Sequence, residues 1–419
     1  MSQSKLHPKK LLIGLLLGLG LMTHISVQAQ LDTNLDKTQA TAVLAPYLHD
    51  QLALTQAIKV MTYQMPYRSG DMQDASALVY YPNTPQPDDG WRIVVWTHGT
   101  VGVADACAPS NNPIGENFKK VSERLLKAGY VIIAPDYEGL GKPGIHPYLH
   151  LQSEADAAIY AVNAIKTQFP NEFQGEWMVA GQSQGGQAAL GTAEYANLDP
   201  TFKGAVAGAP ASGLQHIIRD VAPDALMQLN QREEDAKIPL EARNAIISYA
   251  TLLAYGTFVG IGITASDPTF NYLALFHERA HPFVKLSAGS NGEDGSCLYA
   301  VRDGFKADII DFLQHSEDAT LLDYPGINTE VFHHHPALLN LFKISEPGTK
   351  RLDKPILVIQ GEKDTNVPAV VTEKMVEHLM ALGSPDVSFI LVKDASHTEA
   401  IVWEREAVFN FIQEYMPAK

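Results

Sequence analysis

The chain has 419 residues, of which 46% are hydrophobic and 19% charged. That apolar fraction suffices for a large core and excludes a wholly disordered protein, and at about 150 residues per domain the length favours two to three domains, or one large enzyme domain with an insertion. The 47 acidic and 31 basic side chains give a formal net charge of -16, which argues against nucleic acid or an anionic membrane as a partner because both require a basic surface.

Residues 1–29 have the pattern of a secretory signal peptide. Three lysines within the first ten residues precede an apolar run at 11–22, and small residues lead up to Ala29. An anchoring helix is the alternative, but a run of this length rises only about 18 Å, well short of a hydrocarbon core of ~30 Å. We therefore expect cleavage after Ala29 and an exported protein, secreted or periplasmic.

Strand and helix patterns alternate along most of the remaining chain. After a helical lead-in at 30–60, strands are predicted at 75–81, 91–96, 130–135, 176–180, 202–209, 355–360 and 388–392. Helices are predicted at 118–128, 157–166, 187–195 and 403–415, the second of them preceded by a capping box of Ser153 and Asp156. This order predicts an α/β fold with a mostly parallel central sheet covered by helices on both faces.

The alternation breaks between residues 213 and 351. This stretch contains apolar helical tracts such as 242–258 and a loop rich in Gly and Ser at 287–296. We predict an inserted, mainly helical cap at 213–351 that divides the sheet domain into 30–212 and 352–419. The alternative is that the stretch is more of the sheet domain.

The only cysteines are Cys107 and Cys297. In an oxidising compartment an even pair usually forms a disulfide, and neither cysteine belongs to a Cys-x-x-Cys pair that would indicate a redox or zinc role. We expect a structural bridge, with two separate buried thiols as the alternative.

Gly181-Gln182-Ser183-Gln184-Gly185 has the G-x-S-x-G pattern of a nucleophile elbow, between a predicted strand and a predicted helix. A serine on such a sharp turn adopts strained backbone angles, and the residues two before and two after it come too close together for side chains. Glycine at 181 and 185 satisfies that demand. The pattern predicts Ser183 as a nucleophile; a tight glycine turn with an exposed serine is the alternative.

A serine hydroxyl is a weak nucleophile and needs a base that a carboxylate orients. In this fold the chain order is Ser, then Asp or Glu, then His. Asp364 follows the strand at 355–360 and is the expected carboxylate, with Glu362 as the second choice. His397, after the last strand and before the final helix, is the expected base, although a surface or capping role is the alternative for any one of the 15 histidines.

The loop after an early strand should supply half of an oxyanion hole. Trp96-Thr97-His98-Gly99-Thr100 occupies that place. We expect the backbone amides of Thr100 and of Gln184, the residue after the nucleophile, to stabilise the oxyanion.

No metal or organic cofactor is expected. The run His333-His334-His335 looks like a metal tract, but adjacent residues do not converge on one ion in regular structure, and no set of Asp, Glu or His at helical ligand spacing supports it. His378 lies in a predicted helix and is expected to be solvated.

Several segments together resemble the secretory lipase family of fungi and bacteria: 96–100 (WTHGT), 106–110 (ACAPS), 135–141 (PDYEGLG), 146–149 (HPYL) and 181–186 (GQSQGG). The similarity covers most of the mature chain and is densest at 90–215 and 355–400. The resemblance implies an α/β-hydrolase fold with Ser183, Asp364 and His397 as a triad. It also implies a helical cap acting as a lid, between the sixth and seventh core strands, and ester substrates whose acyl chains the cap holds.

Together these features predict an exported lipase or esterase that works by two-step acyl transfer. Its expected partners are a small-molecule or lipid ester substrate and, transiently, a lipid interface. A serine peptidase or amidase on the same scaffold stays open, because triad geometry does not choose between ester and amide. A non-catalytic binding protein is the other alternative, and the intact Ser, Asp, His order argues against it.

Overall fold

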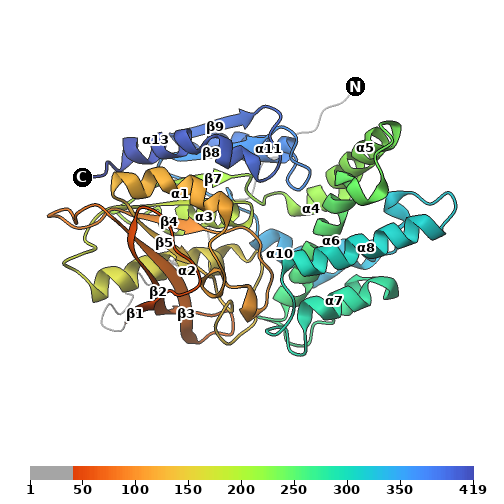
Figure 1. Cartoon of the computed structure of the whole chain (residues 1–419), viewed down its shortest axis with the longest axis horizontal. Coiled ribbons are helices and arrows are strands. Elements are labelled where there is room, and N and C mark those ends of the chain that lie inside the picture. The colour runs from red at the N-terminus through yellow and green to blue at the C-terminus, as the bar shows by residue number, and fades with distance from the viewer. Residues whose placement is uncertain (1–40) are drawn as a thin grey trace, which may run out of the picture. The chain divides into compact units, whose positions relative to one another are not determined.

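A twisted sheet of parallel and antiparallel strands runs through the structure, a computed structural model that describes residues 41–419. The predicted signal peptide and its cleavage site lie outside the described residues. Within these residues nine strands pair in the order β1-β2-β3-β5-β4-β6-β7-β8-β9 (Figure 1). They are β1 (Val43–Pro46), β2 (Thr55–Pro66), β3 (Met72–Pro82), β4 (Ile93–Thr97), β5 (Val131–Pro135), β6 (Trp177–Gln182), β7 (Phe202–Gly208), β8 (Ile356–Gly361) and β9 (Val387–Val392).

Six of these strands, from β5 through β4 to β9, pair in parallel. The other three, β1 to β3, pair antiparallel, and β3 is antiparallel to β5. The sheet is therefore mixed but mostly parallel, as the sequence predicts. Because the carboxyl ends of parallel strands meet at one edge, the loops after β4, β6, β8 and β9 converge there.

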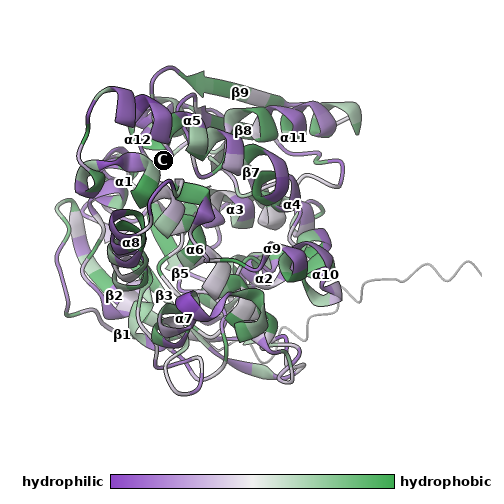
Figure 2. Ribbon diagram, turned by 90° about the vertical axis from the view of Figure 1, so that its right-hand side faces the viewer, coloured by the Kyte–Doolittle hydropathy of each residue, from purple (hydrophilic) through white to green (hydrophobic). Residues whose placement is uncertain are grey.

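Helices cover both faces of the sheet. One face carries α1 (Glu116–Ala128), α12 (Glu399–Trp403) and α13 (Arg405–Tyr415), and the other carries α2 (Leu151–Gln168), α3 (Gln184–Tyr195) and α11 (Ala369–Ala381). Successive strand residues alternate between the two cores: Val94 and Met178 pack with the first set, Ile93 and Val179 with the second. Helices α1 and α11 combine buried apolar residues with polar ones (Figure 2), as expected for amphipathic helices on a buried sheet.

Between β7 and β8 the chain is helical. It forms α4 (Leu214–His216), a π-helical turn (Ile217–Val221), α5 (Ala222–Asp235), α6 (Asn244–Ile263), α7 (His281–Ala288), α8 (Leu298–His315), α9 (Thr329–His334) and α10 (Pro336–Ile344). These helices have a hydrophobic core of their own, and Figure 1 shows α5 to α8 grouped beside the sheet. The expected division of the chain at 213 and 351 remains a prediction.

Helix α6 is the one helix among residues 41–419 whose length and hydropathy would allow it to cross a membrane. Two-thirds of its most apolar window is buried inside the protein, at 67%. Its apolar character is thus accounted for by packing against the neighbouring helices.

The helical lead-in predicted at 30–60 is wrong over its described part. Residues 43–46 form β1, and β2 begins at residue 55. The Ala- and Leu-rich local sequence favours a helix, but β2 pairs with β3 along its length and buries Met61, Tyr63 and Met65. Tertiary pairing therefore overrides local propensity.

Two helix ends also differ from expectation. Helix α2 starts earlier, with His150 as the N-cap whose side chain accepts from the Ser153 N–H, so Ser153 and Asp156 form no capping box. The helix predicted at 403–415 is two helices, α12 and α13, and Trp403 at their junction is about half exposed (48%).

Candidate active site

Ser183 lies on a sharp turn between β6 and α3, with φ 62° and ψ −120°. A Cβ at position 181 would lie 2.1 Å from the Thr97 hydroxyl oxygen, and one at position 185 would lie 1.9 Å from the Thr97 carbonyl oxygen. No side chain fits at either place, so glycine is required at both. The elbow has the steric form that its sequence pattern predicts.

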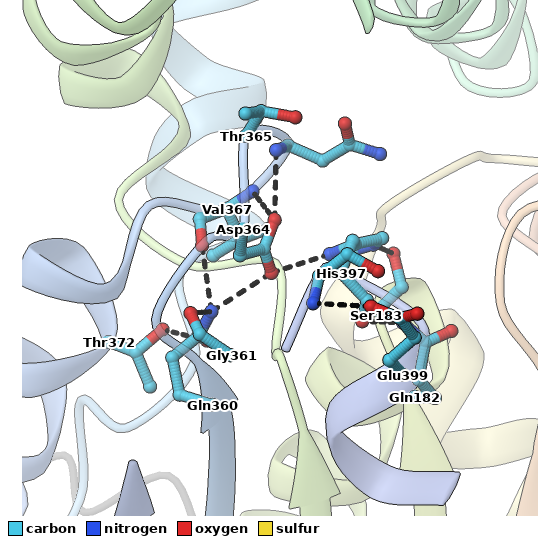
Figure 3. A network of polar contacts seen from close by, with 12 residues as sticks. Gln182, Ser183, Gln360, Gly361, Asp364, Thr365, Val367, Thr372, His397 and Glu399 are labelled. Atoms are coloured by element: carbon cyan, nitrogen blue, oxygen red, sulfur yellow. Dashed lines mark hydrogen bonds and ion pairs between the residues drawn. The ribbon is translucent and has the colours of Figure 1, made fainter. Parts of the chain in front are cut away.

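The side chains of Ser183, His397 and Asp364 form a hydrogen-bonded chain (Figure 3). The His397 Nε2 atom is 2.7 Å from the Ser183 Oγ, and its Nδ1 is 2.7 Å from an Asp364 Oδ2. All three residues are buried. The structure therefore brings together the three side chains that the sequence singled out, from the loops after β6, β8 and β9.

Asp364 is held by a full set of donors. Its Oδ1 accepts from the Asn366 and Val367 N–H groups, each at 2.9 Å, and its Oδ2 accepts from the Gln360 side-chain amide at 2.9 Å as well as from His397. Hydrogen bonds to the ionised form favour the carboxylate. The carboxyl group that faces His397 is thus fixed in orientation by four hydrogen bonds.

Glu362, the second choice, lies elsewhere. It is exposed, and its Oε2 accepts a hydrogen bond from the Asp394 N–H at 3.0 Å. It makes no contact with His397, which decides the geometric choice between the two carboxylates in favour of Asp364.

Sequence reasoning missed two glutamines that support this chain. Gln360 at the end of β8 donates to Asp364 and accepts from the Thr372 hydroxyl at 2.7 Å. Gln182 donates from its side-chain amide to the His397 carbonyl oxygen at 2.9 Å. The only sequence signal for these two glutamines is that each is a polar residue at the end of an otherwise apolar strand, β8 for Gln360 and β6 for Gln182.

The loop after β4 lies against the nucleophile turn. A Cβ on Gly99 would be 3.6 Å from the Ser183 Cβ, so the chain passes close to the serine there. Within residues 41–419 neither the Thr100 nor the Gln184 N–H donates a hydrogen bond. Neither of the two amides that the sequence predicts as oxyanion donors therefore has a hydrogen-bond acceptor within the described part of the chain.

An apolar cavity opens at Ser183 and His397 and extends under the helices between β7 and β8. Its lining residues include Leu214, Ile217, Ile218, Leu226, Leu252, Leu253, Val259, Phe332 and Phe342. Of the residues between 41 and 419 that line it, none is Asp, Glu, Lys or Arg. The cavity offers a bound chain apolar contact along its length and polar groups at one end.

Cys107 and Cys297 are joined by a disulfide. Next to it the Leu298 N–H donates to the Val101 carbonyl oxygen at 2.8 Å. The bridge thus ties the loop that contains Thr100 to the start of α8.

Among the described residues no group of three or more His, Cys, Asp and Glu side chains is arranged to hold a metal ion. His333 and His334 end α9, and the His335 side chain caps α10 by accepting from the Ala337 N–H at 3.2 Å. His378 lies in α11 and is exposed.

Comparisons with known proteins place these features in context. Residues 314–418, which include Asp364 and His397, match the family model of the prolyl oligopeptidase family (Peptidase_S9). No curated protein sequence matches the chain significantly.

Solved structures match over most of the chain. The closed state of lipase A from Candida antarctica aligns with a TM-score of 0.62 and 17% identity, covering 90% of this chain and 81% of that one. The rice cell wall degrading esterase LipA from Xanthomonas oryzae aligns with a TM-score of 0.59 and 16% identity, covering 90% of this chain and 97% of that one. The structural resemblance expected from the sequence is confirmed, and the chain has the α/β-hydrolase fold.

Proposed function

We propose that this protein is a serine hydrolase of carboxylic esters, a lipase or esterase with Ser183, His397 and Asp364 as its catalytic triad. The observation that carries the proposal is the hydrogen-bonded chain of these side chains at the mouth of a cavity with apolar walls. A nucleophile needs its base within hydrogen-bond reach and the base needs an orienting carboxylate. Both conditions are met here.

The reaction would proceed in two steps of acyl transfer. Ser183 Oγ attacks the ester carbonyl carbon while His397 Nε2 takes the hydroxyl proton, and Asp364 stabilises the imidazolium that forms. The alkoxide leaves with the proton that His397 returns, and water repeats the attack on the acyl-enzyme. Amides at Thr100 and Gln184 would stabilise the oxyanion, each worth ~3 kcal/mol of transition-state stabilisation.

The cavity favours an ester with an apolar acyl chain over a peptide. A peptide buried there would leave its backbone N–H and C=O groups without partners, at a cost of ~1 to 3 kcal/mol each. An acyl chain has no such groups, and each buried methylene contributes about 0.8 kcal/mol. The lipase and esterase with similar folds are consistent with this choice.

A serine peptidase or amidase is the second candidate. The prolyl oligopeptidase match at residues 314–418 favours it, since that segment carries two of the three triad positions. Triad geometry serves either reaction, so the difference must come from what the cavity binds.

We further propose that the protein is exported and acts on lipid or small-molecule esters, with transient contact to a lipid interface. The disulfide supports an oxidising compartment, because such bonds are rare in the cytosol. The pattern at 1–29 supports the same location.

The test compares p-nitrophenyl esters of graded chain length with an aminoacyl p-nitroanilide, using wild type and Ser183→Ala. We expect ester turnover that rises with chain length, little amide turnover, and loss of ester turnover by at least about 10⁴-fold in Ser183→Ala. Preferred amide cleavage would support the peptidase. Undiminished hydrolysis by Ser183→Ala would remove the proposed function altogether.

A further inference from the structure

The HPYL motif (residues 146–149) and the first turn of α2 contact the side chains of Thr100 and Gln184, the residues whose amides are the candidate oxyanion donors. On one side, the buried Tyr148 hydroxyl is 2.7 Å from the Thr100 Oγ1. This bond joins the motif to the loop after β4. The Tyr148 hydroxyl makes this contact although it takes no part in the triad.

On the other side, the Gln184 side chain is held by two buried groups. Its amide nitrogen is 2.8 Å from the Glu154 Oε1 and 3.1 Å from the His146 Nε2. Glu154 and His146 have no exposed surface (0% each). The side chain of Gln184, the residue after the nucleophile, is therefore held by hydrogen bonds to two buried groups.

The direction of these hydrogen bonds follows from their partners. His146 Nδ1 is 2.8 Å from the Glu138 carbonyl oxygen, which only accepts, so Nδ1 carries the proton and Nε2 accepts from Gln184. Burial lowers the pKa of His146 to about 3, so the imidazole is neutral. One amide hydrogen of Gln184 thus goes to His146 and the other to Glu154, which fixes the orientation of the amide.

The same segment also contacts α3 at Gln187, one turn after Gln184. The Leu149 carbonyl oxygen accepts from the Gln187 side-chain amide at 3.2 Å, and the Leu149 N–H donates to Glu154 Oε1 at 3.1 Å. Residues 184 and 187 are neighbours on one helix face. The first turn of α3 is therefore held at two points, the side chains of Gln184 and Gln187.

We propose that one segment, residues 146–154, positions both halves of the oxyanion hole, around Thr100 and around Gln184. The inference rests on the proposed function, because it assigns a role within that reaction. The Tyr148 ring also lines the cavity, but its hydroxyl and the Glu154 carboxyl act through Thr100 and Gln184, so these two are positioning groups. Oxyanion donors stabilise the transition state only when they are aimed at the oxyanion in advance, and a segment that contacts both donors sets their separation.

The test uses Tyr148→Phe, Glu154→Leu and the conservative Glu154→Gln, which keeps an acceptor for Gln184. Tyr130→Phe is the matched control, since it removes a buried hydroxyl that donates to the Met416 carbonyl oxygen at 2.6 Å, away from the site. Each variant is assayed for kcat and KM on a p-nitrophenyl ester and for binding of a trifluoromethyl ketone. Ser183 Oγ adds to the carbonyl carbon of the ketone while His397 Nε2 takes the hydroxyl proton, which leaves the former carbonyl oxygen as an oxyanion.

We expect Tyr148→Phe and Glu154→Leu to lower kcat by about tenfold with KM nearly unchanged, and to weaken ketone binding by the same factor. Glu154→Gln should retain most of the wild-type kcat and ketone affinity, and Tyr130→Phe should change neither kcat nor ketone affinity. A purely structural role would lower stability without this parallel loss. If Glu154→Leu does not fold, Tyr148→Phe decides the matter by itself.

Wild-type kcat and ketone affinity in Tyr148→Phe, or a rise in KM alone, would overturn the inference while leaving the proposed function intact. Failure of the proposed function is recognised separately, by ester hydrolysis that persists in Ser183→Ala.

Discussion

The strand-end loops and the helices between β7 and β8 line the same cavity with different kinds of side chain. The loops contribute a few polar groups whose positions are set by strained backbone and by hydrogen bonds, as at Ser183 and Asp364. The helices contribute apolar side chains such as Ile218 and Phe342 and no charge. In the proposed reaction the contrast separates two roles: the loops would carry out the chemistry, and the helices would select the chain that is bound.

The largest expected effect comes from the loops. Asp364→Asn should lower kcat by about 10⁴-fold, because an amide neither holds the required imidazole tautomer nor stabilises the imidazolium. The measurement is kcat on a short-chain ester. Glu362→Gln is the matched control and should retain wild-type turnover; the reverse result would mean that the carboxylate has been assigned to the wrong residue.

The next effect tests the backbone of the elbow. Gly185→Ala places a methyl group 1.9 Å from the Thr97 carbonyl oxygen, so we expect the free energy of unfolding to fall by about 3 kcal/mol. Gly115→Ala is the control, since a Cβ there has no neighbour within 4 Å. Both are measured by denaturant unfolding, and equal stabilities of the two variants would contradict the steric argument.

The third prediction concerns the helices. Ile218→Trp should fill part of the cavity and exclude about three methylenes, which costs roughly fiftyfold in kcat/KM on long-chain esters at about 0.8 kcal/mol per methylene. Acetyl ester turnover should be unchanged. Leu286→Trp, on the exposed side of α7 (41% exposed), is the control. A uniform loss at every chain length would show that the two regions do not divide their roles in this way.

The smallest effect is a dependence of stability on pH. Burial raises the pKa of Glu154 to about 8, above its ordinary value of 4.5. A raised pKa means that the folded protein retains a proton that the unfolded chain releases, so Glu154 lowers stability progressively from about pH 4.5 to about pH 8.

Glu154→Gln does not titrate and should remove that decline. The free energy of unfolding of the variant relative to wild type should therefore rise between about pH 5 and about pH 6.5, on the order of 2 kcal/mol. Chemical denaturation at several pH values measures it, and a constant difference would mean that Glu154 is ionised in the folded protein.

Part of the fold and the site was predictable from local patterns. The apolar run at 130–135 and the alternation of strands and helices predicted the parallel sheet, because strands buried on both faces are apolar throughout. The prediction failed at β2, where Ala and Leu near residues 52–58 suggested a helix, because the strand is stabilised by its pairing with β3 rather than by its own residues.

The sequence by itself determined the nucleophile turn, because the clash that demands glycine at 181 and 185 arises around one short turn. Chain order also narrowed the base and the carboxylate to His397 and to Asp364 or Glu362. Only the tertiary structure showed which of those carboxylates contacts His397, and only it showed the contacts of Gln360 with Asp364 and of the 146–154 segment with Gln184. Such contacts join side chains from different loops and helices, and which buried polar groups satisfy one another depends on how the whole chain packs.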